Sequence, residues 1–359
     1  MSDMSIRQVG PKSAKTSIAF AIKMKRPVFL WGPPGIGKSD IVQQIGSDTE
    51  REVIDVRLAL WEPTDIKGIP YFDSNAGTMT WAPPAELPTD PKSTAILFLD
   101  ELNSAPPAVQ AAAYQLILNR KVGTYVLPKG VDIVAAGNRD GDKGVTYRMP
   151  APLANRFVHL EMKVDFDDWQ DWATLNGIHP EGVGYVGYAK QDLYDYDPKS
   201  PSKSFATPRS WSFVSDLVSD DEIDTESLTN LVSGAIGDGL AVKFMAHRKI
   251  ASKLPKPDDI LDGKVKDLEI KEVSAMYSLT VGLCYELKER ADKKVEKWDA
   301  MADRFFNYMM SNFPTELVVM GAKTALTNYD LPLDASKMKS FDDFHKRFGK
   351  YVMNAMETD

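Results

Sequence analysis

The fold of this chain is decided by one short run of residues, Gly32-Pro33-Pro34-Gly35-Ile36-Gly37-Lys38-Ser39. Every fixed position of the phosphate-binding pattern G-x-x-x-x-G-K-[ST] is present in it. Glycines let the backbone turn tightly, so that successive N–H groups point at the oxygens of a phosphate group. We expect Lys38 to reach the β- and γ-phosphates of a nucleotide and Ser39 to coordinate Mg²⁺.

The residues on either side of this loop have the pattern that such a loop needs. An apolar run at residues 28–31 precedes it, and a helical stretch at residues 39–45 follows it. A helix that starts there directs its positive end at the same anion. Chance alone produces the motif in roughly one chain in a hundred of this length, and the strand and helix around it make chance rarer still. We therefore expect a nucleotide to bind at this loop.

Four further apolar runs indicate strands, at residues 53–56, 95–99, 131–135 and 157–160. Continuous apolar runs bounded by turn residues are typical of parallel strands that are buried on both faces. A helical stretch at residues 108–119 lies between two of them. The pattern predicts an α/β fold in which helices flank a parallel sheet.

The apolar run at residues 95–99 ends in two carboxylates, Asp100 and Glu101. The carboxyl ends of parallel strands meet at one edge of the sheet, so these side chains are expected beside the bound phosphates. Asp100 would hold Mg²⁺ through the water molecules of its shell, and Glu101 would orient and polarise the attacking water. The alternative is a strand that ends in a solvated acidic turn, which the upstream loop disfavours.

A polar amide, Asn138, ends the run Val134-Ala135-Ala136-Gly137-Asn138. Asn138 could hydrogen-bond the attacking water or the γ-phosphate. Gly-Asn is also an ordinary turn signal, so this prediction depends on the order of the motifs along the chain.

These motifs, in this order, resemble those of the AAA+ ATPases and, among them, the MoxR-like group. The loop is similar to the family's Walker A element, Asp100-Glu101 to Walker B, and Asn138 to the sensor 1 position. Residues 100–110, DELNSAPPAVQ, resemble the group's DEINRAPPxxQ segment. Residues 150–157, PAPLANRF, resemble its LPEAxLDRF segment. The resemblance implies an AAA+ P-loop core followed by an all-α lid.

The resemblance extends to two inserts and covers about residues 15–250. Residues 77–84 are similar to the hairpin that precedes the Walker B strand, and residues 121–128 to the insert before sensor 1. The chain departs from the family at Asn155, where an Asp is frequent. Residues 262–359 have no counterpart in the usual shorter chain.

Three arginines receive roles from the resemblance alone. Arg156 falls where the family has an arginine finger, which reaches from one subunit into the nucleotide site of the next and typically raises the rate 10³–10⁵-fold. Arg209 falls at the sensor 2 position, where it would contact the γ-phosphate of its own subunit. Arg148 would be a second arginine acting between subunits. Taken alone, Arg156 would be read as a partner in a surface salt bridge, and Pro208 before Arg209 would be read as an ordinary helix start.

The 359 residues predict two to three domains. We expect an AAA+ core at residues 1–165, a linker and helical lid at 166–260, and a helical C-terminal extension at 261–359. Helically spaced apolar residues support helices in the extension and indicate a buried core there; they are Met276, Leu279, Leu283, Leu287, Trp298, Met301, Phe305 and Met309.

The amino-acid composition excludes several classes of protein. Charged residues make up 26% of the chain and apolar residues 43%, which is typical of a globular protein. The net charge of −8 argues against a non-specific coat on nucleic acid. The single cysteine, Cys284, excludes an internal disulfide, and we expect it to be a core thiol. No apolar run has the length of a membrane span or a signal peptide, so we expect a cytoplasmic protein without membrane contact.

The resemblance implies an ATP- and Mg²⁺-dependent ATPase that assembles with its own copies into a ring, by family habit a hexamer. Such a motor remodels a protein client, and in this group it often works with a partner that carries a von Willebrand factor A domain. Tyr71, Phe72 and Trp81 lie in or near the first insert. They could grip the client or pack the insert's own small core.

Two other functions stay open at this stage. One is a DNA-directed AAA+ machine, such as a helicase loader or a restriction translocase, in which Arg120, Lys121 and Lys129 would line a pore. These charges could equally be solvated on an exposed loop. The other is a scaffold that assembles under nucleotide control without needing hydrolysis, which the presence of Glu101 and Arg156 disfavours.

Overall fold

A computed structural model describes residues 6–139, 141–142, 146–220 and 222–357. The chain divides into two compact units, each with a hydrophobic core of its own. The first unit comprises Met1–Asp165 and Asp197–Lys199, and the second comprises Phe166–Tyr196 and Ser200–Asp359.

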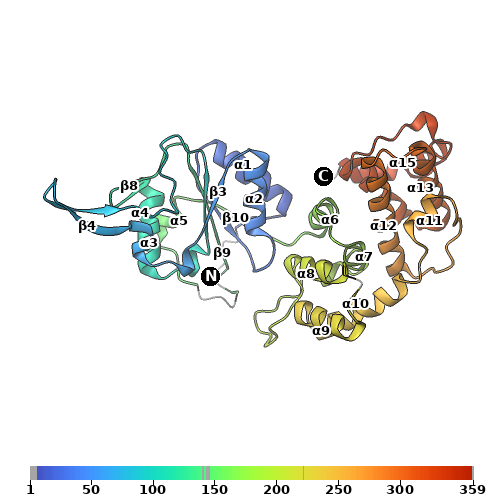
Figure 1. The fold of residues 1–359 in the computed structure, drawn as a ribbon, viewed down its shortest axis with the longest axis horizontal. Coiled ribbons are helices and arrows are strands. Elements are labelled where there is room, and N and C mark those ends of the chain that lie inside the picture. The colour runs from blue at the N-terminus through green and yellow to red at the C-terminus, as the bar shows by residue number, and fades with distance from the viewer. Residues whose placement is uncertain (1–5, 140, 143–145, 221, 358–359) are drawn as a thin grey trace. The chain divides into compact units, whose positions relative to one another are not determined.

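A parallel sheet with the strand order β1-β10-β2-β9-β6-β3 forms the centre of the first unit (Figure 1). Its strands are β1 (Gln8–Val9), β2 (Val28–Trp31), β3 (Val53–Arg57), β6 (Ile96–Asp100), β9 (Asp132–Gly137) and β10 (Val158–Met162). The register places Trp31 opposite Gly137 and Arg57 opposite Asp100. The carboxyl ends of the neighbours β2, β9 and β6 therefore lie together at one edge of the sheet.

The predicted α/β fold with a parallel sheet is confirmed. The five predicted strands are present to within about two residues at each end. Strands β6 and β9, in the interior of the sheet, are buried along their whole length. The expectation of burial on both faces is wrong for β3, an edge strand whose Asp55 and Arg57 are exposed. Strand β1 has two residues, too few to leave a periodic signal in the sequence.

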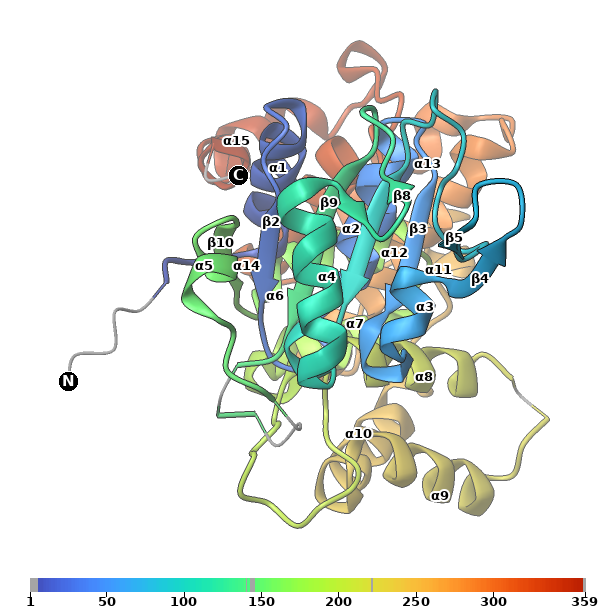
Figure 2. The same ribbon diagram turned by 90° about the vertical axis from the view of Figure 1, so that its left-hand side faces the viewer.

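Helices cover both faces of the sheet (Figure 2). Helices α1 (Pro11–Lys23) and α2 (Lys38–Asp48) pack on one face, while α3 (Pro63–Lys67) and α4 (Pro107–Asn119) pack on the other. Short turns complete the unit: η1 (Leu58–Leu60), η2 (Leu102–Ser104) and α5 (Ala151–Ala154). Alternate residues of β6 meet opposite helices, because successive side chains of a strand point to opposite faces.

Two antiparallel hairpins correspond to the predicted inserts. The first consists of β4 (Ile69–Asp73) and β5 (Thr78–Ala82), and it extends away from the sheet (Figure 1). The second consists of β7 (Lys121–Val122) and β8 (Tyr125–Val126). The first hairpin begins before residues 77–84, which contain only its turn glycine and second strand.

The two hairpins meet at the base of the first. The side chain of Thr124 donates a hydrogen bond from Oγ1 to the carbonyl oxygen of Trp81, at 2.8 Å. The Trp81 ring lies against Gly123. Farther out on β4, Tyr71 and Phe72 are 51% and 69% exposed. These two side chains are therefore not packed in a core of the insert, whereas Trp81 is half-buried.

The second unit is built from helices. They are α6 (Phe166–Leu175), α7 (Pro180–Tyr188), η3 (Lys190–Leu193), α8 (Pro208–Val218), α9 (Thr225–Ile236), α10 (Asp238–Ala251), α11 (Pro257–Leu261), α12 (Val273–Asp292), α13 (Trp298–Asn312), α14 (Thr315–Lys323), η4 (Thr324–Asn328), η5 (Ala335–Lys337) and α15 (Phe341–Glu357). Within the described residues, none of the helices has the length and apolar character needed to cross a bilayer.

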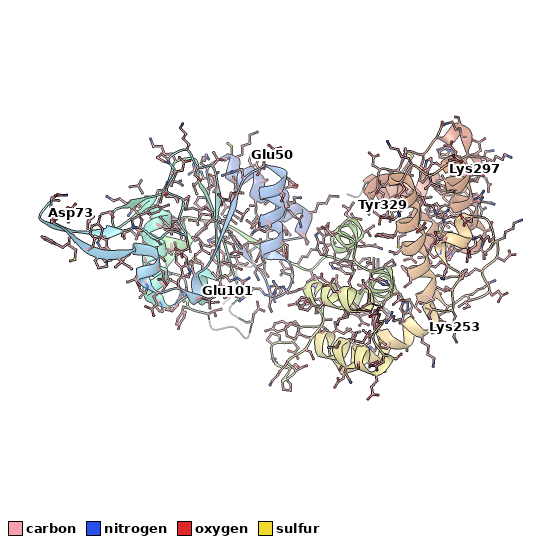
Figure 3. All side chains as sticks on the ribbon, viewed as in Figure 1. Glu50, Asp73, Glu101, Lys253, Lys297 and Tyr329 are labelled. Atoms are coloured by element: carbon pink, nitrogen blue, oxygen red, sulfur yellow. The ribbon has the colours of Figure 1, made fainter. Side chains whose placement is uncertain are left out.

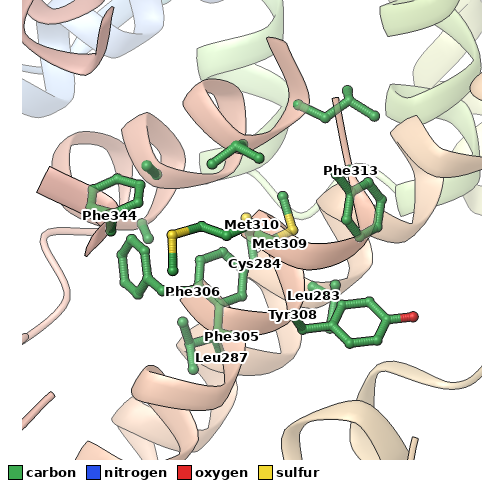
Figure 4. Close-up of a cluster of buried hydrophobic side chains, with 14 of the residues drawn as sticks. Leu283, Cys284, Leu287, Phe305, Phe306, Tyr308, Met309, Met310, Phe313 and Phe344 are labelled. Carbon is green, nitrogen blue, oxygen red and sulfur yellow. The ribbon is translucent and has the colours of Figure 1, made fainter. Parts of the chain in front are cut away.

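Helices α11 to α15 enclose the core of this unit (Figure 4). The predicted apolar stripes of α12 and α13 face into it, with Leu283, Leu287 and Phe305 almost fully buried. Cys284 is a core thiol, as expected, and its burial raises the pKa of the thiol. The proton therefore stays on the sulfur, which makes this cysteine a packing residue.

Helix α12 also packs closely along α7. A side chain at Gly184 would overlap Ser278, and one at Gly187 would overlap Tyr277. The absence of Cβ atoms at these two positions thus allows the close approach. The contact joins residues on both sides of position 260, where we propose that a lid ends and an extension begins.

Candidate active site

The phosphate loop connects β2 to α2 and has the backbone shape that its glycines permit. Gly35 and Gly37 have positive φ angles of 76° and 89°, a region that other residues rarely enter. A Cβ at Gly32 would lie 2.7 Å from Ile36 Cδ1 and 3.0 Å from the carbonyl oxygen of Met162. Glycine is therefore required at position 32 for space and at positions 35 and 37 for conformation.

Helix α2 begins at Lys38, and its N-cap, Gly37, has no side chain to satisfy the first N–H groups. The first N–H groups of a helix have no partner within the helix. At this end of α2 they are available to an anion, which the helix dipole also favours.

The Lys38 side chain folds back over the loop. Its Nζ donates to the carbonyl oxygens of Gly32 and Pro33, at 2.7 and 2.9 Å, and to Oδ1 of Asn138, at 3.2 Å. The ammonium group is thus held between the loop and the end of β9. A positive charge at this point matches the negative charge of nucleotide phosphates.

Ser39 and Asp100 meet across the sheet edge. Ser39 Oγ donates to Asp100 Oδ2 at 3.1 Å, and Asp100 is almost completely buried. A hydroxyl and a carboxylate are oxygen ligands, the type that Mg²⁺ prefers. The donor set therefore fits Mg²⁺, with Ser39 contributing the hydroxyl and Asp100 the charge.

Glu101 lies beside this pair at the edge of the first unit (Figure 3). It has a left-handed backbone conformation, with φ 54° and ψ 33°, and its N–H donates to Asp100 Oδ1 at 2.9 Å. Its side chain is half-buried. A carboxylate that directly follows Asp100 is a candidate for the base that accepts a proton from water.

Asn138 is fixed by a second asparagine, Asn103, for which the sequence alone predicts no role. Asn103 Nδ2 donates to the carbonyl oxygen of Asn138 at 2.7 Å, and Asn103 Oδ1 accepts from the Asn138 N–H at 3.2 Å. The signal available in the sequence was its place in the DELNSAPPAVQ segment, two residues after Glu101.

Asp55 is another carboxylate near the site that the sequence does not identify. It lies on β3, next to the strand that ends in Asp100. Partial desolvation and the charge of Asp100 raise the pKa of Asp55, against the lowering effect of Arg57. Desolvation is the larger of the two causes that raise this pKa.

The three predicted arginines are not joined to this site by hydrogen bonds or ion pairs among the described residues. Arg156 is exposed in the turn between α5 and β10, and Arg148 is exposed in the segment before α5. Arg209 is exposed in the first turn of α8, in the second unit. Their roles toward a nucleotide stay proposals.

Comparison with known proteins identifies the fold. A family model described as AAA domain (dynein-related subfamily) matches residues 27–157, from the residue before β2 to the residue before β10. This range contains the loop, Asp100, Glu101 and Asn138. These residues have the AAA+ fold. An AAA+ domain implies nucleotide binding and ATPase activity.

Individual proteins are only distantly similar to this chain. Midasin of Giardia intestinalis is 28% identical over 182 residues, which is 48% of this chain and only 4% of midasin. The RuvB Holliday junction branch migration motor of Thermotoga maritima is 18% identical, covers 84% of this chain and 86% of its own, and has a TM-score of 0.36. NtrX of Brucella abortus in complex with ADP is 14% identical, and the match covers 84% of this chain and 70% of NtrX with a TM-score of 0.40.

Because these TM-scores are low, the AAA+ assignment rests on the family match and the sheet itself.

Proposed function

We propose that this chain is a Mg²⁺-dependent ATPase of the MoxR-like type, which assembles as a homo-oligomeric ring and remodels or activates a partner protein. One observation carries the proposal: Lys38 Nζ lies 3.2 Å from Asn138 Oδ1, and Ser39 Oγ lies 3.1 Å from Asp100 Oδ2. These two contacts join the phosphate loop to the ends of β9 and β6. Lysine, hydroxyl, carboxylate and amide groups thus converge where the γ-phosphate of ATP would lie.

Each group has a distinct task in hydrolysis. The loop N–H groups and Lys38 bind the phosphates and hold them in line for attack. When bound, Mg²⁺ supplies positive charge to the phosphate oxygens, and Ser39 and Asp100 would hold it. Glu101 orients a water molecule and accepts its proton. Asn138, whose Oδ1 faces Lys38, presents its amide N–H groups to the γ-phosphate or to the water.

The exposure of the Arg156 guanidinium is an argument for the proposed assembly into a ring. An arginine that is presented to solvent on the same unit as the loop can reach the nucleotide of a neighbouring copy, where it would stabilise charge on the departing phosphate. A hexameric ring is the assembly that the MoxR-like resemblance implies. Arg209 would contact the γ-phosphate of its own chain from the start of α8.

Contact with other proteins is the proposed role of the first hairpin. The exposed aromatic residues Tyr71 and Phe72 offer an apolar surface to a protein client. A partner with a von Willebrand factor A domain follows from the family resemblance. A pore that binds DNA is less well supported. The Arg120 guanidinium donates to the carbonyl oxygens of Pro128 and Val131 and thus stabilises its own loop.

The first test is steady-state ATPase activity measured against protein concentration, with the oligomer mass recorded in the same samples. We expect specific activity to rise as a ring assembles in the presence of ATP and Mg²⁺. A monomer that hydrolyses ATP equally well would contradict the ring motor. A ring without turnover would indicate a scaffold, and strong, salt-sensitive stimulation by DNA would indicate a DNA-directed machine.

A mixing experiment tests the role of Arg156 separately. Lys38→Ala removes the binding site, and Arg156→Ala removes the finger, so each variant alone should be inactive. In mixed rings an intact site can face an intact finger, and activity should reappear. Arg26→Ala, an exposed arginine at the amino end of β2, serves as the matched control and should retain activity. If Arg156→Ala assembles and turns over normally, the assignment is wrong.

A further inference from the structure

The buried side-chain amide of Asn103 lies next to Asn138, at the sheet edge where hydrolysis is proposed. Asn103 is 1% exposed and lies in η2, immediately after Glu101. Its side chain binds both main-chain groups of Asn138, donating to the carbonyl oxygen and accepting from the N–H. This pairing also fixes the orientation of the Asn103 amide, because a flipped amide would place oxygen against oxygen and N–H against N–H.

The space around this pair is filled. A Cβ at Gly137 would overlap Asn103 Oδ1 and would lie 2.7 Å from the ring of Phe29. The main-chain oxygen of Asn103 accepts from the N–H of Tyr147, at 2.7 Å. Asn103 thus joins three segments that are distant in sequence: the end of β6, the end of β9 and the segment before α5.

The main-chain position of Asn138 determines where its side chain lies. From that position Oδ1 reaches Lys38 Nζ at 3.2 Å, which leaves the amide N–H groups directed elsewhere. If the two hydrogen bonds from Asn103 were lost, the Asn138 backbone could shift by a fraction of an ångström. Catalysis is sensitive to displacements of this size, because hydrogen bonds to the transition state depend steeply on geometry.

We infer that Asn103 is a positioning residue for ATP hydrolysis, which acts by fixing the main chain of Asn138. The inference rests on the proposed function, in which Asn138 contacts the γ-phosphate or the attacking water. It predicts an effect on turnover rather than on binding, because Lys38 keeps its hydrogen bonds to the carbonyl oxygens of Gly32 and Pro33 within the loop that holds the nucleotide. It also predicts that Asn103 has no catalytic effect once the Asn138 side chain is removed.

The test is a double-mutant cycle on the full chain, with Asn103→Ala, Asn138→Ala and the double variant. We expect Asn103→Ala to lower kcat about tenfold or more and to change the Kd of a non-hydrolysable ATP analogue less than about threefold. In the Asn138→Ala background the same substitution should change kcat by less than about twofold. Rescue should be absent in Asn103→Asp, whose second oxygen would face the carbonyl oxygen of Asn138.

A matched control is available in the same segment. Gln110 is a buried amide that donates to the carbonyl oxygen of Ala105, at 2.9 Å, and among the described residues it makes no hydrogen bond to Asn138. Gln110→Ala should lower thermal stability as much as Asn103→Ala does, yet leave kcat within about twofold. Oligomer mass and melting temperature are recorded for every variant. If Asn103→Ala does not fold, the nearly isosteric Asn103→Asp takes its place in the cycle.

The outcomes separate the inference from the proposed function. A wild-type chain that hydrolyses no ATP overturns the proposed function, and the inference falls with it. A wild-type ATPase whose losses at positions 103 and 138 multiply in the double variant overturns only the inference. So does a loss of nucleotide affinity in Asn103→Ala that equals its loss of turnover, since that result indicates a general disturbance of the site.

Discussion

Lys38 and Glu101 lie at the same sheet edge but act at different stages of the proposed reaction. Lys38→Ala removes the ammonium group that faces the phosphates, and we expect nucleotide affinity to fall on the order of 100-fold or more. Glu101→Gln keeps the shape of the side chain and removes the base, so affinity should persist while turnover is lost. Titration calorimetry with ATP and a turnover assay measure the two effects. Loss of binding in Glu101→Gln would contradict the division of roles.

His247 makes the second unit sensitive to acid. The ring is buried, its Nε2 pairs with Ser278 Oγ at 2.9 Å, and its Nδ1 has no hydrogen-bond partner in the described part of the chain. Burial lowers the pKa of His247 from 6.5 to about 4. The unfolded chain therefore takes up the proton first, and this contribution to stability is complete above pH 6.5 and is lost as the pH falls toward 4.

The expected loss is about 3 kcal/mol between pH 7 and pH 4. Denaturant unfolding of the wild type and of His247→Gln at a series of pH values measures it. The difference between the two curves should grow only below pH 6.5. His345, which is exposed on α15, supplies the control His345→Gln, whose curve should follow that of the wild type. Parallel curves for all three proteins would contradict the prediction.

Many residues of the candidate site could be predicted because they are either consecutive in the sequence or stand at the end of a predicted strand. The loop from Gly32 to Ser39 forms from consecutive residues, and Asp100 and Asn138 each end a strand. The pairing of Asn103 with Asn138 joins residues that are 35 positions apart. It depends on β6 and β9 being neighbours, so no local pattern could reveal it.

At the scale of the element, side-chain hydrogen bonds stabilise the first turn of helix α8. Thr207 Oγ1 accepts from the Ser210 N–H at 3.1 Å, and Ser210 Oγ accepts from the Thr207 N–H at 2.7 Å. This reciprocal pair is a capping box, and Pro208 at the first helical position adds the correct φ angle. The exposed Arg209 is thus carried on a well-defined helix start.

Replacing the cap should loosen that start. Thr207→Ala leaves the Ser210 N–H without its acceptor, and we expect the free energy of unfolding to fall by about 1 kcal/mol. Thermal or urea unfolding checks the value. Thr229→Ala, at a half-buried position in the middle of α9 that takes no part in a cap, should change stability by less than about 0.5 kcal/mol. Equal losses in the free energy of unfolding at both positions would show that the capping box does not stabilise the protein.

Three of the five correctly predicted strands have a strong burial signal. Strands β2, β6 and β9 are continuous apolar runs because helices cover both of their faces. Strand β4 contains Pro70 and is exposed along most of its length, so its sequence has neither alternation nor a continuous apolar run. Its pairing with β5 gives it regular structure without a core.

At the scale of the molecule, the two units have separate cores, and all the proposed nucleotide contacts within one chain lie in the first unit except that of Arg209. We therefore expect calorimetry to resolve two unfolding transitions, of which ATP analogue and Mg²⁺ raise one. At free nucleotide 100 times Kd the stabilisation should be about 2.7 kcal/mol. Hydrogen exchange should locate it in residues 6–139, and Lys38→Ala should abolish it. A single transition that shifts as a whole would contradict independent unfolding.

The sequence predicts helices in the second unit but not their partners. Apolar spacing over residues 276–287 indicates a helix with one or more buried faces. Its close approach to α7 depends on Gly184 and Gly187, and glycine in a sequence is equally consistent with a turn. Packing partners are thus decided by tertiary complementarity, which single-sequence periodicity does not record.

The backbone at Glu101 has a consequence for how this protein can change over generations. A left-handed conformation, φ 54°, costs a residue with a Cβ about 1–2 kcal/mol relative to glycine. Glu101 therefore holds a place that glycine would occupy at lower energy. Selection for heat resistance alone would drive this position toward glycine and discard the carboxylate. Its persistence in a lineage would record continued demand for the chemistry, because folding by itself provides no reason to keep it.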